Sequence, residues 1–487
     1  MSEDSSALLS RLQQLQCHFT WDLKLDVSPK KLITRTEIDI EFHQSPYKGA
    51  SCFYSLLAYF RYLQDQREEA LKLLNQSEET IRESYGDESE RRLIVTYGDM
   101  AWLKYHDGDF EKSESYCQRV EDILVKYPTG SSGSLLPEVY GEQGWAYFKV
   151  SRSSISKAID CFRKALEVQP HDVEWNTCYA VVLFCGEQWV LENLQEDEES
   201  QAIKQLRFAL EINPNNAALQ CSLGAKLAAY KKYEEAESLV KKALENDPDN
   251  PHIIRHSGKY LRERNRLDEA IVVFERGLKR GDQLSSFNYQ LALCYKQKII
   301  AERRRRFSNR EEVRKWRRIC ISHLEESVKR KRPFVLAWAE LALLCAEAGD
   351  MSRAEEAFQK CLETLPEVEE EKDCQTIHQR CGDFLHYHKK NEAQAIAHYT
   401  KGLLIPQKKY NWRQCAKKLK QIADRRLAKN RGDGEALALL GQVARAEGDR
   451  KRAAFFYEKA LNCDKDNEEY LSALCELRLE LQGSSSD

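Results

Sequence analysis

The amino-acid sequence predicts an all-α fold, a superhelix built from tetratricopeptide repeats. Small and aromatic residues recur at the fixed offsets of a 34-residue helix-turn-helix unit. Turns containing proline, NPNN at 213–216 and DPDN at 247–250, follow expected helices. No segment keeps the two-residue alternation of a β-strand. A chain of 487 residues is too long for one ordinary compact core, so these observations favour an elongated α-solenoid.

The clearest copies of the repeat lie in the middle and the C-terminal part of the chain. In one copy Gly224 precedes Ala236 by twelve residues, and Val240, Ala243 and Pro248 follow. Small residues let the two helices of a repeat approach closely, and proline ends the second helix. The same spacing returns in three more copies: Gly258, Ala270, Phe274 and Gly277; Ala342, Ala354, Phe358, Cys361 and Pro366; Gly441, Ala453, Tyr457 and Ala460.

Less regular copies complete the array. They begin near Leu56, Thr96 and Ile377, which brings the expected total to roughly nine or ten repeats with helical insertions between some of them. The predicted segments are an N-terminal helical segment contributing to the groove (1–52), N-terminal and central repeats with the pocket (53–283), a pivot repeat with a long basic extension (284–333), and C-terminal repeats with a capping helix (334–487).

Composition indicates a globular protein of the cytosol. Hydrophobic residues make up 42% and charged residues 31% of the chain, with only 11 Pro and 21 Gly. The sixteen cysteines show no CxxC or CxxxC spacing and fall mostly inside apolar helical patterns, so we expect reduced, buried thiols. The polar N-terminus lacks the pattern of a signal peptide, and no long apolar run predicts a membrane span.

Two segments interrupt the repeat period. Residues 186–200 carry six acids and no base, which favours a solvated insertion. Residues 301–332 contain 13 Lys or Arg against 5 acids, a local excess of +8. This basic extension is typical either of a soluble helix surface or of a surface that attracts nucleic acid, and the sequence leaves both open.

The repeat register gives one group of cations a direction. In stacked repeats the first helices line the concave groove. The repeat that begins at Pro251 then directs His252, Arg255, Lys259 and Arg262 into this groove, at spacings of three or four residues. Cations gathered on one concave face repel one another, and an anion offsets that repulsion.

Neighbouring repeats add to this predicted pocket. The preceding repeat places only small residues at the same positions, which leaves room beside the cations. The following one adds Tyr289 and Lys296, and an earlier one adds Trp145 and Lys149. An indole in such a helix is also typical of a core, and for Trp145 both interpretations stand. Cations, aromatic surface and room together suit phosphates attached to a chain of bases.

Several motifs outside the general repeat pattern resemble one known family. They are CHFTW at 17–21, LLAYF at 56–60, TYGDMAWLKYH at 96–106, GWAYFK at 144–149 and YLSALCELRL at 470–479. These motifs are similar to those of the interferon-induced proteins with tetratricopeptide repeats, and the similarity runs from about residue 8 to residue 482. The resemblance implies a cytosolic antiviral effector that binds the 5′ end of single-stranded RNA, triphosphorylated or incompletely capped, and blocks its translation.

The resemblance also implies roles for individual residues. The pocket lysine falls on Lys149, the cap-stacking tryptophan on Trp145, and the phosphate-binding arginines on Arg255 and Arg262. In the N-terminal segment, a residue facing the terminal phosphates falls on Arg35. The complete candidate RNA-binding set is Arg35, Trp145, Lys149, His252, Arg255, His256, Lys259, Arg262, Tyr289, Gln290 and Lys296.

The chain departs from the family pattern at four positions. Cys185 stands where the family often has an arginine, and Asp39 replaces a frequent glutamine. Ile155 replaces a tyrosine, and Glu263 replaces the second arginine of the RHSGKYLRE helix. The positive charge of the pocket is therefore expected to be lower than in the strongest triphosphate binders, unless Asp39 pairs with Arg35 or holds a bridging cation.

Other function classes remain as alternatives. Repeat solenoids often bind proteins, so the chain could be an interaction scaffold, or it could form homo- or hetero-oligomers through its C-terminal repeats. An enzyme is disfavoured because no GxxxxGK[ST], GxGxxG, HExxH or GxSxG motif occurs. No Cys/His spacing predicts a metal site, and no cofactor is expected.

Overall fold

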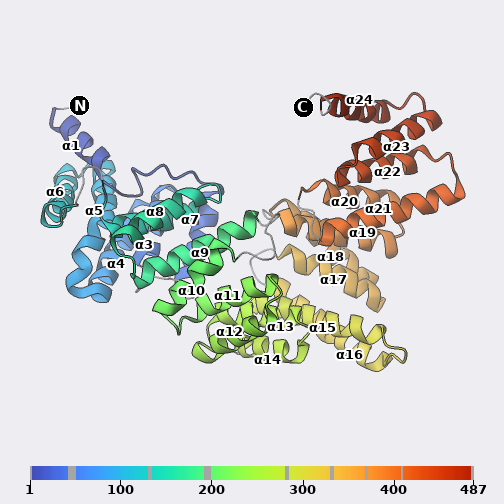
Figure 1. The fold of residues 1–487 in the computed structure, drawn as a ribbon, viewed down its shortest axis with the longest axis horizontal. Helices are drawn as coiled ribbons and strands as arrows, with labels where there is room; N and C mark the ends of the chain where they lie inside the picture. The colour runs from blue at the N-terminus through green and yellow to red at the C-terminus, as the bar shows by residue number, and fades with distance from the viewer. Residues whose placement is uncertain are drawn as a thin grey trace. The chain divides into compact units, whose positions relative to one another are not determined.

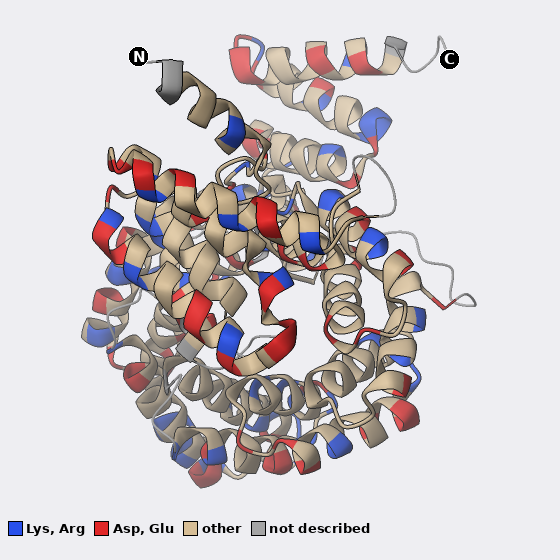
Figure 2. Cartoon of the chain, turned by 90° about the vertical axis from the view of Figure 1, so that its left-hand side faces the viewer, with Lys and Arg blue, Asp and Glu red and all other residues tan. Residues whose placement is uncertain are grey.

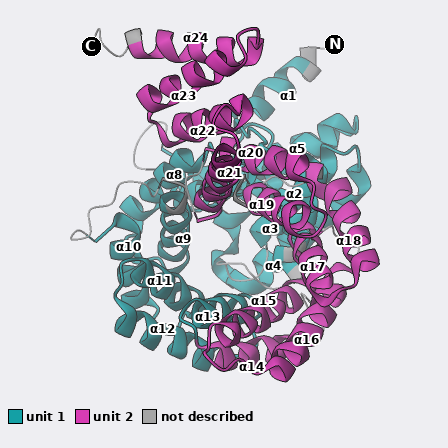
Figure 3. Cartoon of the chain, turned by 90° about the vertical axis from the view of Figure 1, so that its right-hand side faces the viewer, with its two compact units in different colours: residues 1–265 teal, residues 266–487 magenta. Residues whose placement is uncertain are grey.

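The structure, a computed structural model, describes residues 3–41, 51–129, 134–190, 199–279, 284–329, 334–367, 371–406 and 410–483. The chain divides into two compact units, residues 1–265 (unit 1) and 266–487 (unit 2), which Figure 3 draws in teal and magenta. The boundary between the units falls inside the predicted segment 53–283, and the four-part division of the chain stays a prediction.

Both units are built from helices, labelled in Figure 1. Unit 1 contains α1 (Glu3–Gln14), α2 (Pro29–Glu41), α3 (Ser51–Tyr62), α4 (Arg67–Tyr85), η1 (Gly86–Glu88), α5 (Ser89–His106), α6 (Phe110–Lys126), α7 (Pro137–Val150), α8 (Ile155–Val168), α9 (Val173–Val190), α10 (Gln201–Ile212), α11 (Ala217–Ala229), α12 (Tyr233–Asn246) and α13 (Pro251–Glu263). Unit 2 contains α14 (Leu267–Leu278), α15 (Leu284–Arg303), α16 (Arg310–Val328), α17 (Val335–Ala348), α18 (Met351–Thr364), η2 (Leu365–Glu367), α19 (Glu371–Tyr387), α20 (Glu392–Leu404), α21 (Tyr410–Lys429), α22 (Gly434–Glu447), α23 (Arg450–Cys463) and α24 (Glu468–Gly483).

The arrangement confirms the predicted all-α repeat fold. Consecutive helices pack as pairs: α3 with α4, α5 with α6, α7 with α8, α9 with α10 and α11 with α12 in unit 1. Unit 2 continues this pattern in α15 with α16, α17 with α18, α19 with α20 and α22 with α23. The described ranges contain no strand, and none of their helices is both long and apolar enough to cross a membrane.

Close contacts at small residues hold the helix pairs together. Gly441 on α22 faces the ring of Tyr457 on α23, and a Cβ atom built at Gly441 would lie 2.8 Å from that ring. Gly382 on α19 faces Tyr399 on α20 in the same way, at 2.5 Å. A side chain at either position would push the partner helix away. The spacing of Gly441 and Tyr457 in the sequence therefore has the physical cause that the repeat pattern predicted.

Asparagine side chains fix where the helices after the two predicted turns begin. Asn216 in the NPNN turn accepts a hydrogen bond from the backbone N–H of Leu219 and caps α11. Asn250 in the DPDN turn accepts one from His252 at 2.9 Å and caps α13, whose first residue is Pro251. Both turns occur where the sequence predicted them, and the register of α13 is set by its own cap.

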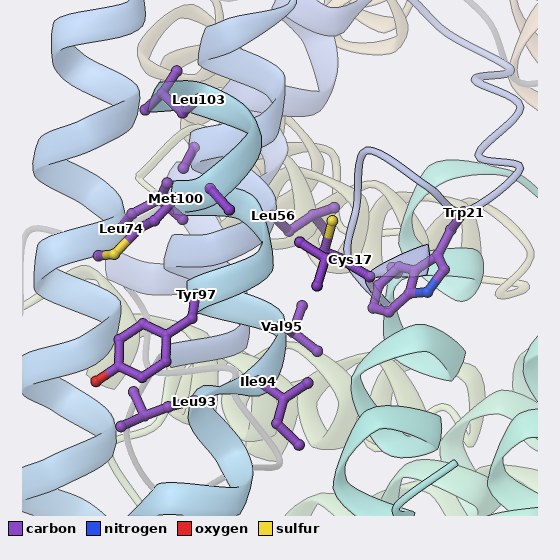
Figure 4. Packing of buried hydrophobic residues seen from close by; sticks show 14 of the residues in the cluster. Cys17, Trp21, Leu56, Leu74, Leu93, Ile94, Val95, Tyr97, Met100 and Leu103 are labelled. Carbon is purple, nitrogen blue, oxygen red and sulfur yellow. The ribbon is translucent and has the colours of Figure 1, made fainter. Parts of the chain in front are cut away.

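The CHFTW stretch anchors the N-terminal segment to the first repeats. His18 forms a buried pair with Asp99 on α5: its backbone N–H donates a 2.9 Å hydrogen bond to the carboxylate, and its Nδ1 lies 2.6 Å from the other carboxylate oxygen. Cys17 and Trp21 lie beside Leu56 of α3 and Val95 of α5 in one apolar cluster (Figure 4). The motif is therefore part of the core of unit 1.

The cysteines are mostly buried, as the sequence predicted. All sixteen cysteines are free thiols and twelve are buried, whereas Cys463 and Cys475 are exposed. Blue and red residues are interspersed along the helices in Figure 2, and the formal net charge of the chain is −3. Most of the acidic insertion at 186–200 lies outside the described residues.

Candidate nucleic-acid interface

Helix α13 separates an apolar face from a polar face, as the repeat register predicted. Ile253, Ile254, Ser257, Gly258 and Leu261 are buried against the neighbouring repeat helices. Five other positions form a polar face, which is half-buried except for the exposed Lys259. They are His252, Arg255, His256, Lys259 and Arg262. The phase of the buried residues therefore leaves the five predicted α13 residues on one side.

Lys149 is the best-defined cation of unit 1 outside α13. Its ammonium group donates a 2.7 Å hydrogen bond to the carboxylate of Asp39, which lies 110 residues earlier on α2. The same ammonium lies 4.9 Å from the ring of Trp145 and 5.1 Å from that of Phe53. An acid and two aromatic faces thus hold the lysine in one position.

Arg255 belongs to the same electrostatic neighbourhood. Burial lowers the pKa of Arg255, and the carboxylate of Asp39 acts in the opposite direction. The structure therefore brings Lys149 from α7, Arg255 from α13 and Asp39 from α2 together. We call these three residues, together with His252 and His256, the cation cluster.

The two histidines of the cation cluster lie one helical turn apart, with their rings tilted by 43° relative to each other. Their ring centroids lie 4.3 Å from each other. Burial, reinforced by Arg255 and Lys149, lowers the pKa of His252 to about 4. Burial, reinforced by His252, Arg255 and Lys259, lowers the pKa of His256 well below its ordinary value. Both imidazoles are therefore neutral at pH 7, and each still has a ring N–H to donate.

Cys185 on α9 experiences the positive charges of two lysines. Burial raises the pKa of Cys185 to about 11, and Lys149 and Lys226 act against that rise. Lys226 on α11 is itself only 3% exposed and donates a 2.8 Å hydrogen bond to Glu187. A second lysine thus lies near the position where the family has an arginine, but an acid already pairs with it.

The C-terminal end of α13 is partly neutralised. Lys259 and Arg262 lie 3.8 Å and 3.9 Å from the carboxylate of Glu263, which stands where the family has an arginine. The guanidinium of Arg264 stacks on the ring of Tyr233 at 3.7 Å, away from the predicted groove positions. The charge density is therefore highest near Arg255 and falls toward the end of the helix.

Trp145 and Arg35 differ in accessibility. Trp145 is 3% exposed and packs edge-on against Phe53 at 5.6 Å in an apolar cluster, so the structure favours its core interpretation. A stacking role for Trp145 remains a prediction. Arg35 is exposed on α2, one turn before Asp39. Asp39 forms its ion pair with Lys149, a partner that the sequence analysis did not consider.

Tyr289, Gln290 and Lys296 lie on α15 in unit 2. Tyr289 is buried and packs edge-on against Phe334 at 4.7 Å, so it does not offer the expected aromatic surface. Gln290 beside it is half-buried. Lys296 pairs with the buried Glu340, which also accepts a 2.7 Å hydrogen bond from Arg380. The pattern of repeat positions did not predict this ion triad, because its acid, Glu340, lies in a helix whose other residues are mostly apolar.

The basic extension at α15 and α16 is compensated in part. Arg303 pairs with Glu347 at 2.8 Å, and Arg305 pairs with Glu302 at 2.9 Å. Burial, together with the positive charges of Arg303 and Arg314, lowers the pKa of Arg317. Across the residues described, no group of three or more His, Cys, Asp or Glu side chains could hold a metal ion.

Comparisons with known proteins agree with this architecture. Models of the tetratricopeptide repeat match residues 49–126, 193–254, 227–294, 335–366 and 434–467. The human antiviral innate immune response effector IFIT1 is 32% identical over 472 residues, which cover 96% of this chain and 98% of that protein. The chain belongs to the family of interferon-induced proteins with tetratricopeptide repeats.

Other members of the family are similar over most of their length. Human interferon-induced protein with tetratricopeptide repeats 2 is 30% identical over 488 residues, covering 97% of each chain. The family member numbered 3 in mouse is 29% identical over 401 residues, 80% of this chain and 93% of that protein. The chain is thus a homologue of antiviral effectors.

Two solved structures of the family resemble this chain. The human IFIT1 dimer with m7Gppp-AAAA has a TM-score of 0.74 and 33% identity, covering 94% of this chain and all of that chain. The human IFIT1 dimer with PPP-AAAA has a TM-score of 0.71 and 32% identity, with the same coverage. The family fold is therefore one in which a member has been seen as a dimer with capped and with triphosphorylated RNA.

The ion triad around Glu340 generates a prediction about stability. Burial opposes its ionisation, but Arg380 and Lys296 lower the pKa of Glu340 from 4.5 to about 2. Its stabilising effect is thus fully present above pH 4.5 and is lost as the pH falls toward 2. Glu340→Gln should lower the free energy of unfolding by on the order of 3 kcal/mol at pH 7, and by less at pH 3 to 4.

Urea unfolding of both proteins across this pH range measures the effect. Glu363→Gln is a matched control, because Glu363 pairs with Lys360 on the helix surface of the same unit and should change little. An equal loss for the two variants at pH 7 would contradict the structural importance of the triad.

Proposed function

We propose that this protein binds the 5′ end of single-stranded RNA, triphosphorylated or incompletely capped, in the cytosol and thereby blocks translation of that RNA. It acts as a binder and not as an enzyme. The observation that carries the proposal is the cation cluster. Lys149 and Arg255 come from repeats about a hundred residues apart, and one acid, Asp39, compensates both of them.

The charges of the cation cluster suit an anionic ligand. Lys149 and Arg255 carry two positive charges against the single charge of Asp39, and a triphosphate carries more charge than a carboxylate. Phosphate oxygens can therefore replace Asp39 as the acceptor of the Lys149 hydrogen bond, and Arg255 can bind them through charge-assisted hydrogen bonds. Arg262 and Arg35 extend the predicted contacts along the RNA.

The similarity to IFIT1 supports the same proposal. IFIT1 has been solved with triphosphorylated and with capped oligonucleotides, and this chain shares about a third of its residues. The candidate residues are expected to contact the phosphates and not the edges of the bases. The protein should therefore select only weakly for the base sequence of the RNA. Selection would come from the chemistry of the 5′ end, since a narrow repeat groove excludes a duplex.

The first prediction concerns the phosphate contacts. Lys149→Ala and Arg255→Ala should each weaken binding of 5′-triphosphate single-stranded RNA about 10- to 100-fold, because each removes charge-assisted hydrogen bonds worth roughly 1.5–3 kcal/mol. Fluorescence anisotropy with the triphosphate RNA and its 5′-hydroxyl counterpart measures this. Arg264→Ala is the matched control, since Arg264 directly follows the helix that carries Arg255 but stacks on Tyr233. Equal affinity of the wild-type protein for both RNAs would contradict the proposal.

The second prediction concerns the acid of the cation cluster. Asp39→Asn keeps the shape of the side chain but removes the charge that repels a phosphate. We expect the variant to bind 5′-triphosphate RNA about five- to tenfold more tightly at 0.15 M salt, and the gain to shrink as salt is raised. The same anisotropy titration at two salt concentrations tests it. Weaker binding by the variant would instead indicate that Asp39 holds Lys149 or a bridging cation in position.

Exposed apolar side chains near the C-terminus favour oligomerisation as a second function. Phe455 on α23 and Leu471 and Leu479 on α24 are 49%, 52% and 69% exposed. IFIT1 has been solved as a dimer. We expect this chain to form homo- or hetero-oligomers through its C-terminal repeats, in addition to binding RNA. Light scattering over a dilution series should show a mass that falls with concentration toward 56.6 kDa, and a constant monomer mass would contradict it.

A further inference from the structure

We infer that His252 and His256 form a proton-accepting pair that adds a positive charge to the cation cluster when an RNA 5′ phosphate binds. This inference rests on the proposed function, because the anion that triggers protonation is the 5′ phosphate. It assigns to the two histidines a role that permanent cations cannot have: their charge appears only in the bound state.

The geometry of the pair provides an atom for the proton. Nδ1 of His252 is buried, and within the described part of the chain it has no hydrogen-bond partner. A buried imidazole nitrogen without a partner costs free energy, which a proton shared with a phosphate oxygen would recover. In the bound state a proton from solvent occupies this nitrogen, and the resulting Nδ1–H donates a hydrogen bond to a phosphate oxygen.

The closeness of the two rings limits the uptake to about one proton. The ring centroids are 4.3 Å apart, so two imidazolium ions would repel each other strongly. The first proton therefore lowers the tendency of the second ring to accept another. The pair titrates as a unit, and His256 can hold the proton when His252 is replaced.

Burial, together with the charges around the pair, explains why the pair is neutral before RNA binds. The groups that act on His252 are Arg255 on its own helix and Lys149 on α7, and His256 also experiences Lys259. All of them are positive. Beyond them, Asp39 on α2 is paired with Lys149, and on α9 and α11 Cys185 is a protonated thiol and Glu187 is paired with Lys226.

A phosphate reverses this balance. Its negative charge next to the cluster favours the imidazolium form, so the pKa of the pair must be higher in the complex than in the free protein. Binding and protonation are then linked: protons promote phosphate binding to the same extent that phosphate promotes protonation. The additional affinity is present below the pKa of the bound pair and disappears as the pH rises through that value.

Proton uptake on phosphate binding compensates for the small permanent positive charge of the cation cluster. Asp39 neutralises part of Lys149, and a thiol, Cys185, stands at the position of a family arginine. A fixed extra cation would add to the repulsion between Lys149, Arg255 and Lys259 in the empty site. A histidine pair avoids this repulsion until the ligand arrives.

The test counts protons during binding. Isothermal titration calorimetry of the full-length protein with 5′-triphosphate single-stranded RNA at pH 6.5, in buffers of different ionisation enthalpy, gives the number taken up. Wild type should take up about 0.5 to 1 proton more than His252→Gln/His256→Gln, and the same RNA in both titrations cancels its own protonation. The ratio of the wild-type affinity to that of the double variant should rise as the pH falls from 8 to 6. The rise is at most about tenfold for each pH unit and each proton taken up.

Controls separate this inference from the proposed function. His171→Gln replaces an exposed histidine of the same unit and should behave as wild type, and circular dichroism melting shows whether the variants are folded. Should triphosphate RNA bind with the same proton count in wild type and folded double variant, the proton role is wrong and the proposed function stands. Should wild type fail to distinguish triphosphate from 5′-hydroxyl RNA at every pH, both are overturned.

Discussion

Close approach of the two helices within each repeat is the constraint on which the rest of the structure depends. A glycine or alanine on one helix faces an aromatic or aliphatic side chain on the other, as Gly441 faces Tyr457. This contact fixes the rotation of each helix about its axis, because only one face carries the small residues. Once that rotation is fixed in α13, Ile253 and Ile254 must be buried, and Arg255 lies on the opposite, polar side.

The polar side of α13 carries a local excess of positive charge. The chain is nearly neutral, and many of its described cations are paired with acids, among them Lys226 with Glu187 and Lys296 with Glu340. In the cation cluster the single acid Asp39 compensates two bases, Lys149 and Arg255, so a local positive charge remains. An excess that is small, local and partly buried interacts with an anion more strongly than a larger excess on an open surface, where water screens it.

Sequence analysis succeeded where a local pattern carries the information. The repeat spacing predicted the helices, the Asn-containing turns and the polar face of α13. It failed for Tyr289 and Lys296, whose repeat positions indicated an open groove but whose side chains are covered by Phe334 and bound by Glu340. Repeat position specifies a direction from the helix axis, and it does not specify which long side chain of another helix reaches the same place.

By itself, the sequence determined the fold class, the family and the line of cations on one helix, because each follows from residues close together in the chain or from a recurring period. Only the tertiary structure decided that Asp39 pairs with Lys149 across 110 residues, that Trp145 is buried, and that His252 and His256 are neutral. These properties depend on burial and on charges supplied by other helices, and desolvation and Coulomb interactions act through space and not along the chain.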